Sequence, residues 1–73
     1  MLTFCNRIKE IRILKNIKQT ELAEFLNIQP RALRFYESGE REPNFETLIN
    51  ICKYLNVSSD YLLGLSDNPD INK

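Results

Sequence analysis

The chain contains two short helical patterns separated by only three residues, and this spacing limits how the two helices can pack. Apolar residues fall on one face in each of the two stretches, residues 19–26 and residues 30–38. A link as short as residues 27–29 permits only a tight and steep crossing between the helices. Ala23 is small enough for the point where they cross, and Asn27 tolerates the left-handed backbone conformation that the turn needs. The sequence therefore predicts two crossed helices that share one core.

The second helix of this pair has a clear start and a clear end. Proline at a first helical position loses a donor that would have had no partner there, so Pro30 is expected to open the helix. Gly39 supplies a left-handed exit. Leu33 and Tyr36 lie three residues apart and are expected to face the core. The opposite face then carries Arg31, Arg34, Phe35 and Ser38.

Three further helices are expected around this pair, and no convincing strand alternation is present. They cover approximately residues 4–15, residues 44–55 and residues 59–63. Asn44 and Ser58 are suitable N-caps for the last two. The sequence therefore predicts an all-α fold, a compact bundle of five helices.

Length and composition favour one small domain. A chain of 73 residues with 42% hydrophobic and 27% charged residues matches a single compact soluble domain. We expect that domain over residues 1–66, and a flexible polar tail over residues 67–73. The sequence has no apolar run long enough to span a membrane, and its N-terminus lacks the layout of a signal peptide. These features favour a cytoplasmic protein that does not associate with membranes.

The residue types argue against catalysis and metal binding. The chain has no histidine, and Cys5 and Cys52 do not form a CxxC pair, so no metal site is expected. Without histidine the commonest general base is also missing, and we find no nucleophile–base set and no phosphate-binding loop. We therefore expect no catalytic residues, no cofactor and no small-molecule ligand.

The formal net charge is zero, but the charges are distributed unevenly. Residues 1–41 carry eight basic and five acidic residues, a net charge of +3. Residues 42–73 carry two basic and five acidic residues, a net charge of −3. One basic half beside one acidic half is typical of proteins that bind nucleic acids.

Four motifs bring these features together: RIKEIR, IKQTELAEFLNI, YESGEREP and LINICKYLNVSSDYLLG. With these motifs, which extend from about Arg7 to Gly64, the chain resembles the Cro- and phage-repressor-like (XRE-type) helix-turn-helix regulators. The resemblance implies a lambda-repressor-like bundle in which the second and third helices form the helix-turn-helix. It also implies a sequence-specific regulator of transcription, such as a small phage, prophage or bacterial repressor, that binds operator DNA as a homodimer. A nucleoid-associated location in the bacterial cytoplasm and a palindromic operator would follow.

The resemblance also implies which residues read bases in the major groove. Arg31 is the foremost candidate, because arginine can pair with both O6 and N7 of a guanine. Phe35 either presses on a thymine methyl group or packs against a neighbouring side chain. Pro30 occupies a position where many relatives have a polar reader, and proline cannot donate a hydrogen bond. The expected base-reading set is Gln29, Pro30, Arg31, Ala32, Arg34 and Phe35.

A second set is expected to hold phosphates, which fixes the register of the protein on the duplex without reading sequence. The glutamine at the start of the second helix matches one that relatives use for this purpose. Helix N-termini contribute through free backbone amides, here including the amide of Phe45. The expected phosphate-binding set is Lys18, Gln19, Ser38, Arg41, Asn44 and Phe45.

One charged pair and two apolar sets are expected to serve the structure or the assembly of the protein rather than DNA binding. Arg12 and Glu37 match a pair that forms a salt bridge in relatives, although Arg12 could instead contact DNA. Ile13 and Leu14 could either pack or form an exposed patch. A second apolar set is the expected dimer interface and consists of Tyr61, Leu63 and Leu65.

One alternative to operator recognition stays open. The chain could be an antitoxin-like protein, or an interaction module that kept this fold and acts mainly through a protein partner. The zero net charge and Pro30 are the features that favour it.

Overall fold

The computed structural model describes residues 2–71, and over this range the fold is all-α with no strand. The fold class and the five expected helices are therefore confirmed. The first helix begins two residues earlier than expected and ends one residue earlier. The five helices are α1 (Leu2–Leu14), α2 (Gln19–Leu26), α3 (Pro30–Ser38), α4 (Phe45–Leu55) and α5 (Ser59–Leu63).

Residues in the left-handed conformation follow the helices, and Asn27 and Gly39 are the two that the sequence predicted. Asn16 follows α1 with φ 60°, and Asn27 follows α2 with φ 59°. Gly39 ends α3 with φ 86°, a value that a residue with a Cβ atom rarely adopts. The backbone amide of Asn27 bonds back to the carbonyl groups of Ala23 and Glu24, which satisfies two acceptors at the end of α2. The three-residue turn before α3 is thereby held in one conformation.

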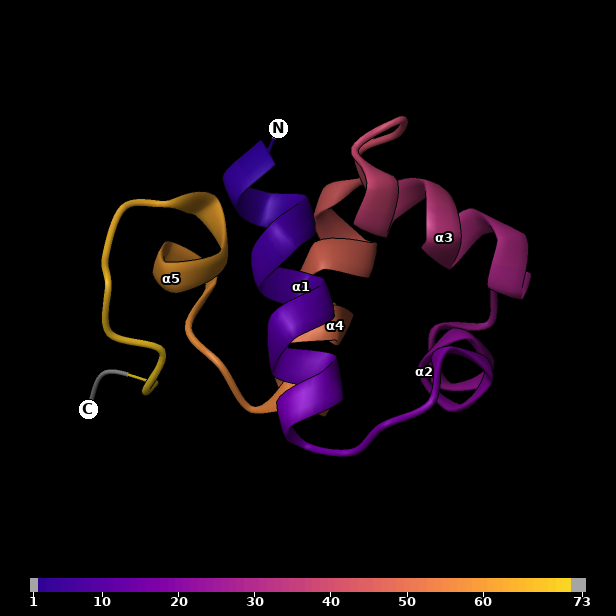
Figure 1. Cartoon of the computed structure of the whole chain (residues 1–73), viewed down its shortest axis with the longest axis horizontal. Helices are drawn as coiled ribbons and strands as arrows, with labels where there is room; N and C mark the ends of the chain where they lie inside the picture. The colour runs from indigo at the N-terminus through magenta and orange to yellow at the C-terminus, as the bar shows by residue number, and fades with distance from the viewer. Residues whose placement is uncertain (1, 72–73) are drawn as a thin grey trace.

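Figure 1 shows α1 running through the middle of the molecule, with α4 behind it. The crossed pair α2 and α3 lies on one side of α1, and α5 lies on the other side. Helix α1 packs against α3 and α5, and α2 packs against α3 and α4. None of the helices within residues 2–71 is long and apolar enough to cross a membrane.

One continuous core lies where the five helices meet. Its fully buried members include one leucine from each helix of the crossed pair, Leu22 and Leu33. Burial of such a side chain contributes about 1.5–3 kcal/mol relative to leaving it exposed. Half-buried side chains, including Tyr36, pack around the outside. The core consists of Phe4, Ile8, Ile11, Leu22, Ala23, Leu26, Leu33, Ile51, Leu55, Val57 and Leu62.

The segment after α5, described as far as residue 71, is held against the helices by hydrogen bonds. Arg7 donates from Nη1 to the carbonyl oxygens of Tyr61 at 2.5 Å and Ser66 at 2.8 Å. It also donates from Nη2 to the carboxylate of Asp67 at 2.9 Å. The amide of Ser58 donates to the carbonyl of Pro69 at 2.9 Å. The first five residues of the expected tail (67–71) are described and make some of these contacts, and residues 72–73 lie outside the described range.

Candidate nucleic-acid interface

The first turn of α3 presents unpaired donors to solvent. Gln29 is the N-cap with an extended backbone (φ −70°, ψ 146°), and its side chain makes no capping hydrogen bond. Pro30 follows as the first helical residue. Arg31 and Arg34 are exposed, and neither forms an ion pair within residues 2–71. These four residues line one shallow depression. The start of α3 therefore places the uncapped side chain of Gln29 beside two arginines that have no carboxylate partner among the described residues.

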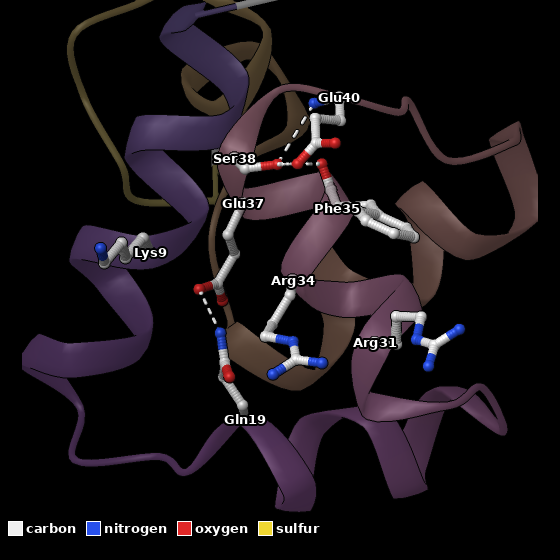
Figure 2. A pocket seen from close by; sticks show the side chains of 8 residues that line it. All are labelled: Lys9, Gln19, Arg31, Arg34, Phe35, Glu37, Ser38 and Glu40. Atoms are coloured by element: carbon white, nitrogen blue, oxygen red, sulfur yellow. Dashed lines mark hydrogen bonds between the residues drawn. The ribbon is translucent and has the colours of Figure 1, made fainter.

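A larger concavity of about 540 Å³ opens between α1, the start of α2 and the outer face of α3. Figure 2 shows Arg34 extending toward the space beside Gln19, whereas Arg31 points away from it into solvent. Glu37 lies at the rear of this space and Glu40 lies at its rim. The concavity is lined by Lys9, Gln19, Arg31, Arg34, Phe35, Glu37, Ser38 and Glu40.

Glu37 is buried, and it joins three elements of the fold. Arg12 donates to both of its carboxylate oxygens, from Nε to Oε2 at 2.7 Å and from Nη2 to Oε1 at 3.1 Å. The exposed fractions of the two side chains are only 11% for Arg12 and 4% for Glu37. Arg12 also donates from Nη1 to the carbonyl of Ile17 at 2.9 Å, which holds the linker before α2. In this arrangement the charge of Arg12 is neutralised inside the fold.

Gln19 completes the set of donors around that carboxylate. Its Nε2 donates to Oε1 of Glu37 at 3.0 Å, which fixes the orientation of the amide group. The amide has a second N–H that this bond does not use, and the side chain remains partly exposed. Lys18 precedes it as the N-cap of α2, is exposed and makes no side-chain capping bond. The start of α2 thus places the oriented side-chain amide of Gln19 at the concavity, next in sequence to the exposed Lys18.

The end of α3 carries a polar cluster that includes an acidic residue. The Ser38 hydroxyl lies 2.9 Å from the carboxylate of Glu40 and 3.2 Å from the carbonyl of Phe35. A hydroxyl has one proton, so it donates to one of these two acceptors at a time. Ser38 is therefore already bonded inside the protein, and Glu40 brings a negative charge to this face.

Phe35 is half-buried and lies beneath an arginine. The guanidinium carbon of Arg41 is 5.1 Å from the centre of the Phe35 ring, within the range of a cation–π contact. Of the two roles expected for Phe35, packing against a neighbour is therefore observed. A contact with a thymine methyl group stays a prediction. Ala32, one turn before the ring, is also half-buried.

The start of α4 holds two of the expected phosphate-binding residues, Asn44 and Phe45. The side chain of Asn44 accepts a hydrogen bond from the amide of Thr47 at 2.8 Å, as an N-cap does. Asn44 is exposed, and the ring of Phe45 is 84% exposed. The amides of the first turn that Asn44 does not cap remain available to an anion.

Lys9 belongs to this surface, although the sequence did not single it out. It is exposed on α1 and lines the concavity together with Gln19, Arg31 and Arg34. A signal was present in the sequence, because Lys9 precedes Arg12 by three residues and therefore lies on nearly the same face of α1. Since Arg12 faces α3, that face of α1 is the one beside the concavity.

The expected dimer residues occupy three different environments. Tyr61 is half-buried, with the guanidinium carbon of Arg7 lying 4.1 Å from the centre of its ring. Leu63 is half-buried in a shallow apolar groove, and Leu65 is 76% exposed. The groove is lined by Phe4, Glu42, Pro43, Phe45, Leu48 and Leu63.

Two other expectations concern apolar exposure and metal ions. Ile13 and Leu14 are 58% and 78% exposed, so they form the exposed patch rather than additional packing. Among the described residues, no group of three or more potential protein ligands could hold a metal ion. Cys5 is buried beside the end of α3, and Cys52 is half-buried on α4.

A crossed pair of helices with a left-handed turn and an exposed second helix defines the helix-turn-helix class of domain. The helix-turn-helix family matches residues 8–62, about three quarters of the chain. The chain belongs to this family, in its Cro- and phage-repressor-like (XRE-type) branch, as the sequence predicted. Membership also confirms the expectation of a helix-turn-helix domain rather than an enzyme domain.

Among curated proteins, the chain is 41% identical over 68 residues to YqaE of Bacillus subtilis, an uncharacterised HTH-type transcriptional regulator. This match covers 93% of the chain and 59% of YqaE. The chain spans about half to three fifths of the length of YqaE and of three other curated relatives from Bacillus subtilis.

Two solved structures show the same fold bound to DNA. The P22 c2 repressor in complex with a synthetic operator superposes with a TM-score of 0.77 at 34% identity, over 81% of this chain and 89% of the repressor. SinR, a master regulator for biofilm formation solved in complex with DNA, gives a TM-score of 0.75 at 30% identity. That match covers 82% of this chain and 97% of SinR.

Proposed function

We propose that this chain is a sequence-specific DNA-binding domain of a transcriptional regulator, which reads the major groove with α3. The observation that carries this proposal is the exposed start of α3, where Arg31 and Arg34 have no carboxylate partner among residues 2–71. An unneutralised arginine beside an open helix N-terminus suits a polyanionic ligand. The resemblance to a repressor solved with its operator supports double-stranded DNA as that ligand.

Base reading falls to the first half of α3. Arg31 points into solvent and can reach the O6 and N7 acceptors of a guanine. Gln29 can pair with adenine through its unbonded side-chain amide. Pro30 and Ala32 contribute only apolar contacts, so polar reading rests on Gln29, Arg31 and Arg34. Phe35 contributes mainly through Arg41, which lies over its ring.

Phosphate binding is assigned to residues at the start of α2, after the end of α3 and at the start of α4. Lys18 and Gln19 act at the start of α2, and Arg41 acts in the loop after α3. Asn44 and the amide of Phe45 act at the start of α4. Lys9 joins this set from α1. Ser38 would have to exchange its bond with Glu40 for a phosphate, which makes it the weakest member.

We propose further that the protein binds as a homodimer to a palindromic site. The longest dimension of the described chain is 31 Å, and successive major grooves on one face of DNA lie about 34 Å apart, so a single copy reads only one half-site. Leu65, the ring of Phe45 and the groove beside Leu63 offer exposed apolar surface for a second copy. A regulator of this kind would act in the bacterial cytoplasm, associated with the nucleoid. The alternative of a module that acts mainly through a protein partner is not favoured.

Selection of binding sites from a randomised duplex library tests the proposal. We expect an enriched sequence near physiological salt, with two related half-sites. Weak, salt-sensitive binding without enrichment would refute sequence-specific reading and would favour the protein-partner alternative. A single enriched half-site without its repeat would refute only the dimeric part.

A further inference from the structure

We infer that Phe35 is a positioning residue for DNA binding, whose ring holds the Arg41 guanidinium ready for a phosphate without neutralising its charge. This inference rests on the proposed function of the domain. It assigns to Phe35 a role other than base contact, and it names Arg41 as the group through which Phe35 acts.

Two arginines of this fold are paired with carboxylates, and Arg41 is not. Arg7 lies 2.9 Å from a carboxylate oxygen of Asp67, and Arg12 lies 2.7 Å from one of Glu37. An arginine paired in this way has lost much of its attraction for a second anion. Arg41 makes no ion pair within residues 2–71, and its guanidinium lies over the ring of Phe35.

The contact with the ring leaves the hydrogen-bond donors of Arg41 unused. A cation–π contact occupies the face of the guanidinium and none of its five N–H donors. Those donors match the paired oxygens of a phosphate in a bidentate arrangement. Holding the side chain on an aromatic ring therefore reduces the conformational entropy lost on binding while it keeps the full charge available.

The backbone of the loop after α3 is held by hydrogen bonds that do not involve the Phe35 side chain. The carbonyl oxygen of Phe35 accepts from the amides of Gly39, of Glu40 at 3.0 Å and of Arg41 at 3.2 Å. Any residue at position 35 has this carbonyl. A change of the Phe35 side chain is therefore expected to leave the loop path in place and to release only the guanidinium of Arg41.

The test is a double-mutant cycle on DNA affinity, with Phe35→Leu, Arg41→Ala and the double variant. Phe35→Leu is expected to weaken binding by about 2- to 5-fold, the factor that corresponds to an exposed cation–π contact. In the Arg41→Ala background the same change is expected to weaken binding by less than about 2-fold. The loss should be equal for selected and unselected duplexes, because phosphates carry no sequence information.

Two controls separate this role from a structural one. Phe35→Tyr keeps the ring and is expected to retain the affinity of the wild type, and thermal unfolding identifies any variant that is not folded. In the free protein, nuclear magnetic resonance should show upfield ring-current shifts of the Arg41 side-chain protons, and these shifts should disappear in Phe35→Leu.

The outcomes are distinguishable. A Phe35→Leu loss that is the same with and without Arg41 overturns the inference and indicates direct contact of the ring with DNA. A loss restricted to duplexes with thymine at one position would identify that contact as base reading. If the ring-current shifts are seen but the effects of Phe35→Leu and Arg41→Ala on affinity are additive, the inference is overturned and the proposed function is not. If the wild type shows no selective DNA binding, the proposed function itself is overturned.

Discussion

Arg12 on α1 and Glu37 on α3 form a bidentate ion pair that is almost completely buried, with its shortest N–O distance at 2.7 Å. Gln19 at the start of α2 donates to the same carboxylate. The pair therefore joins α1 to α3, and Gln19 adds the start of α2 to the same group. It fixes the position of α3 in the fold, and the exposed arginines Arg31 and Arg34 take no part in it.

We predict that Arg12→Ala lowers stability more than it lowers the DNA affinity of the folded protein. Removing one member of a buried pair leaves a charge without its partner, which costs about 3–5 kcal/mol. The loss should fall near the lower end, because Gln19 still donates to Glu37. Denaturant unfolding measures the change, and Arg12→Lys serves as the milder variant if Arg12→Ala does not fold. Lys15→Ala is the control, because it removes an exposed positive charge just after α1. It should change stability by less than about 0.5 kcal/mol.

We predict that Lys18→Ala reduces the salt dependence of DNA binding without changing base preference. Each phosphate contact that is lost lowers the slope of log affinity against log salt concentration by about 0.9. Lys18 is exposed at the start of α2, where the anion would approach. Lys53→Ala removes the same charge from an exposed position on α4 that lines none of the α3 depressions, and it should leave the slope unchanged. Equal slopes for both variants would exclude Lys18 as a phosphate contact.

We predict that Phe45→Ala weakens self-association while the fold is retained. The Phe45 ring is 84% exposed beside the groove that contains Leu63, so its removal costs the isolated domain little packing. The backbone amide at position 45 remains, which preserves any phosphate contact made by the start of α4. Sedimentation equilibrium over a concentration series should show a shift of the dimer toward monomer. A wild-type protein that is monomeric at about 100 µM, a concentration at which a micromolar dimer is nearly complete, would contradict the dimer proposal.

We predict that Tyr54 ionises at higher pH than a free tyrosine. Its hydroxyl donates to a carboxylate oxygen of Glu21 at 2.5 Å, and this hydrogen bond raises the pKa of Tyr54 above its ordinary value. A pKa raised by folding adds stability that is fully present below the unfolded pKa and is lost as the pH rises through the folded pKa. Titration by tyrosinate absorbance should show a lower pKa in Glu21→Gln than in the wild type. An unchanged titration curve would show that the bond does not persist in solution.

The boundaries of α2, α3 and α5 were predictable because local chemistry determines them, whereas α1 begins two residues earlier than expected. Pro30, Gly39 and the capping residues Asn44 and Ser58 act through their own backbone or through residues two to four positions away. The left-handed turn at Asn27 follows from the same short-range rules. The fold class then followed from the link length, since two helices joined so closely must cross.

Contacts between side chains of different helices could not be predicted as readily from the sequence. That Gln19 shares the carboxylate of Glu37 depends on how α1, α2 and α3 meet, and no local pattern specifies this. The same holds for Arg41 over Phe35 and for Lys9 at the concavity. The resemblance identified the Arg12 and Glu37 pair. Relatives with the same pair show which residues of different helices meet in three dimensions, whereas hydrophobic periodicity shows only which face of one helix is buried.

One binding experiment addresses whether Arg31 reads a base. The selected duplex is prepared with each guanine replaced in turn by 7-deazaguanine, which removes the N7 acceptor and preserves base pairing. Affinities are then measured for the wild type, for Arg31→Ala and for the charge-matched control Lys53→Ala.

At one guanine in each half-site, the replacement should weaken binding of the wild type and of Lys53→Ala by about 1 kcal/mol, the lower end of the range for a bidentate arginine–guanine pair, because O6 of the guanine still accepts from the arginine. The same replacement should leave Arg31→Ala unaffected, because the partner of N7 is already absent. A loss of equal size in all three proteins would show that Arg31 does not read that base. No effect at any guanine would contradict reading of guanine N7 by α3.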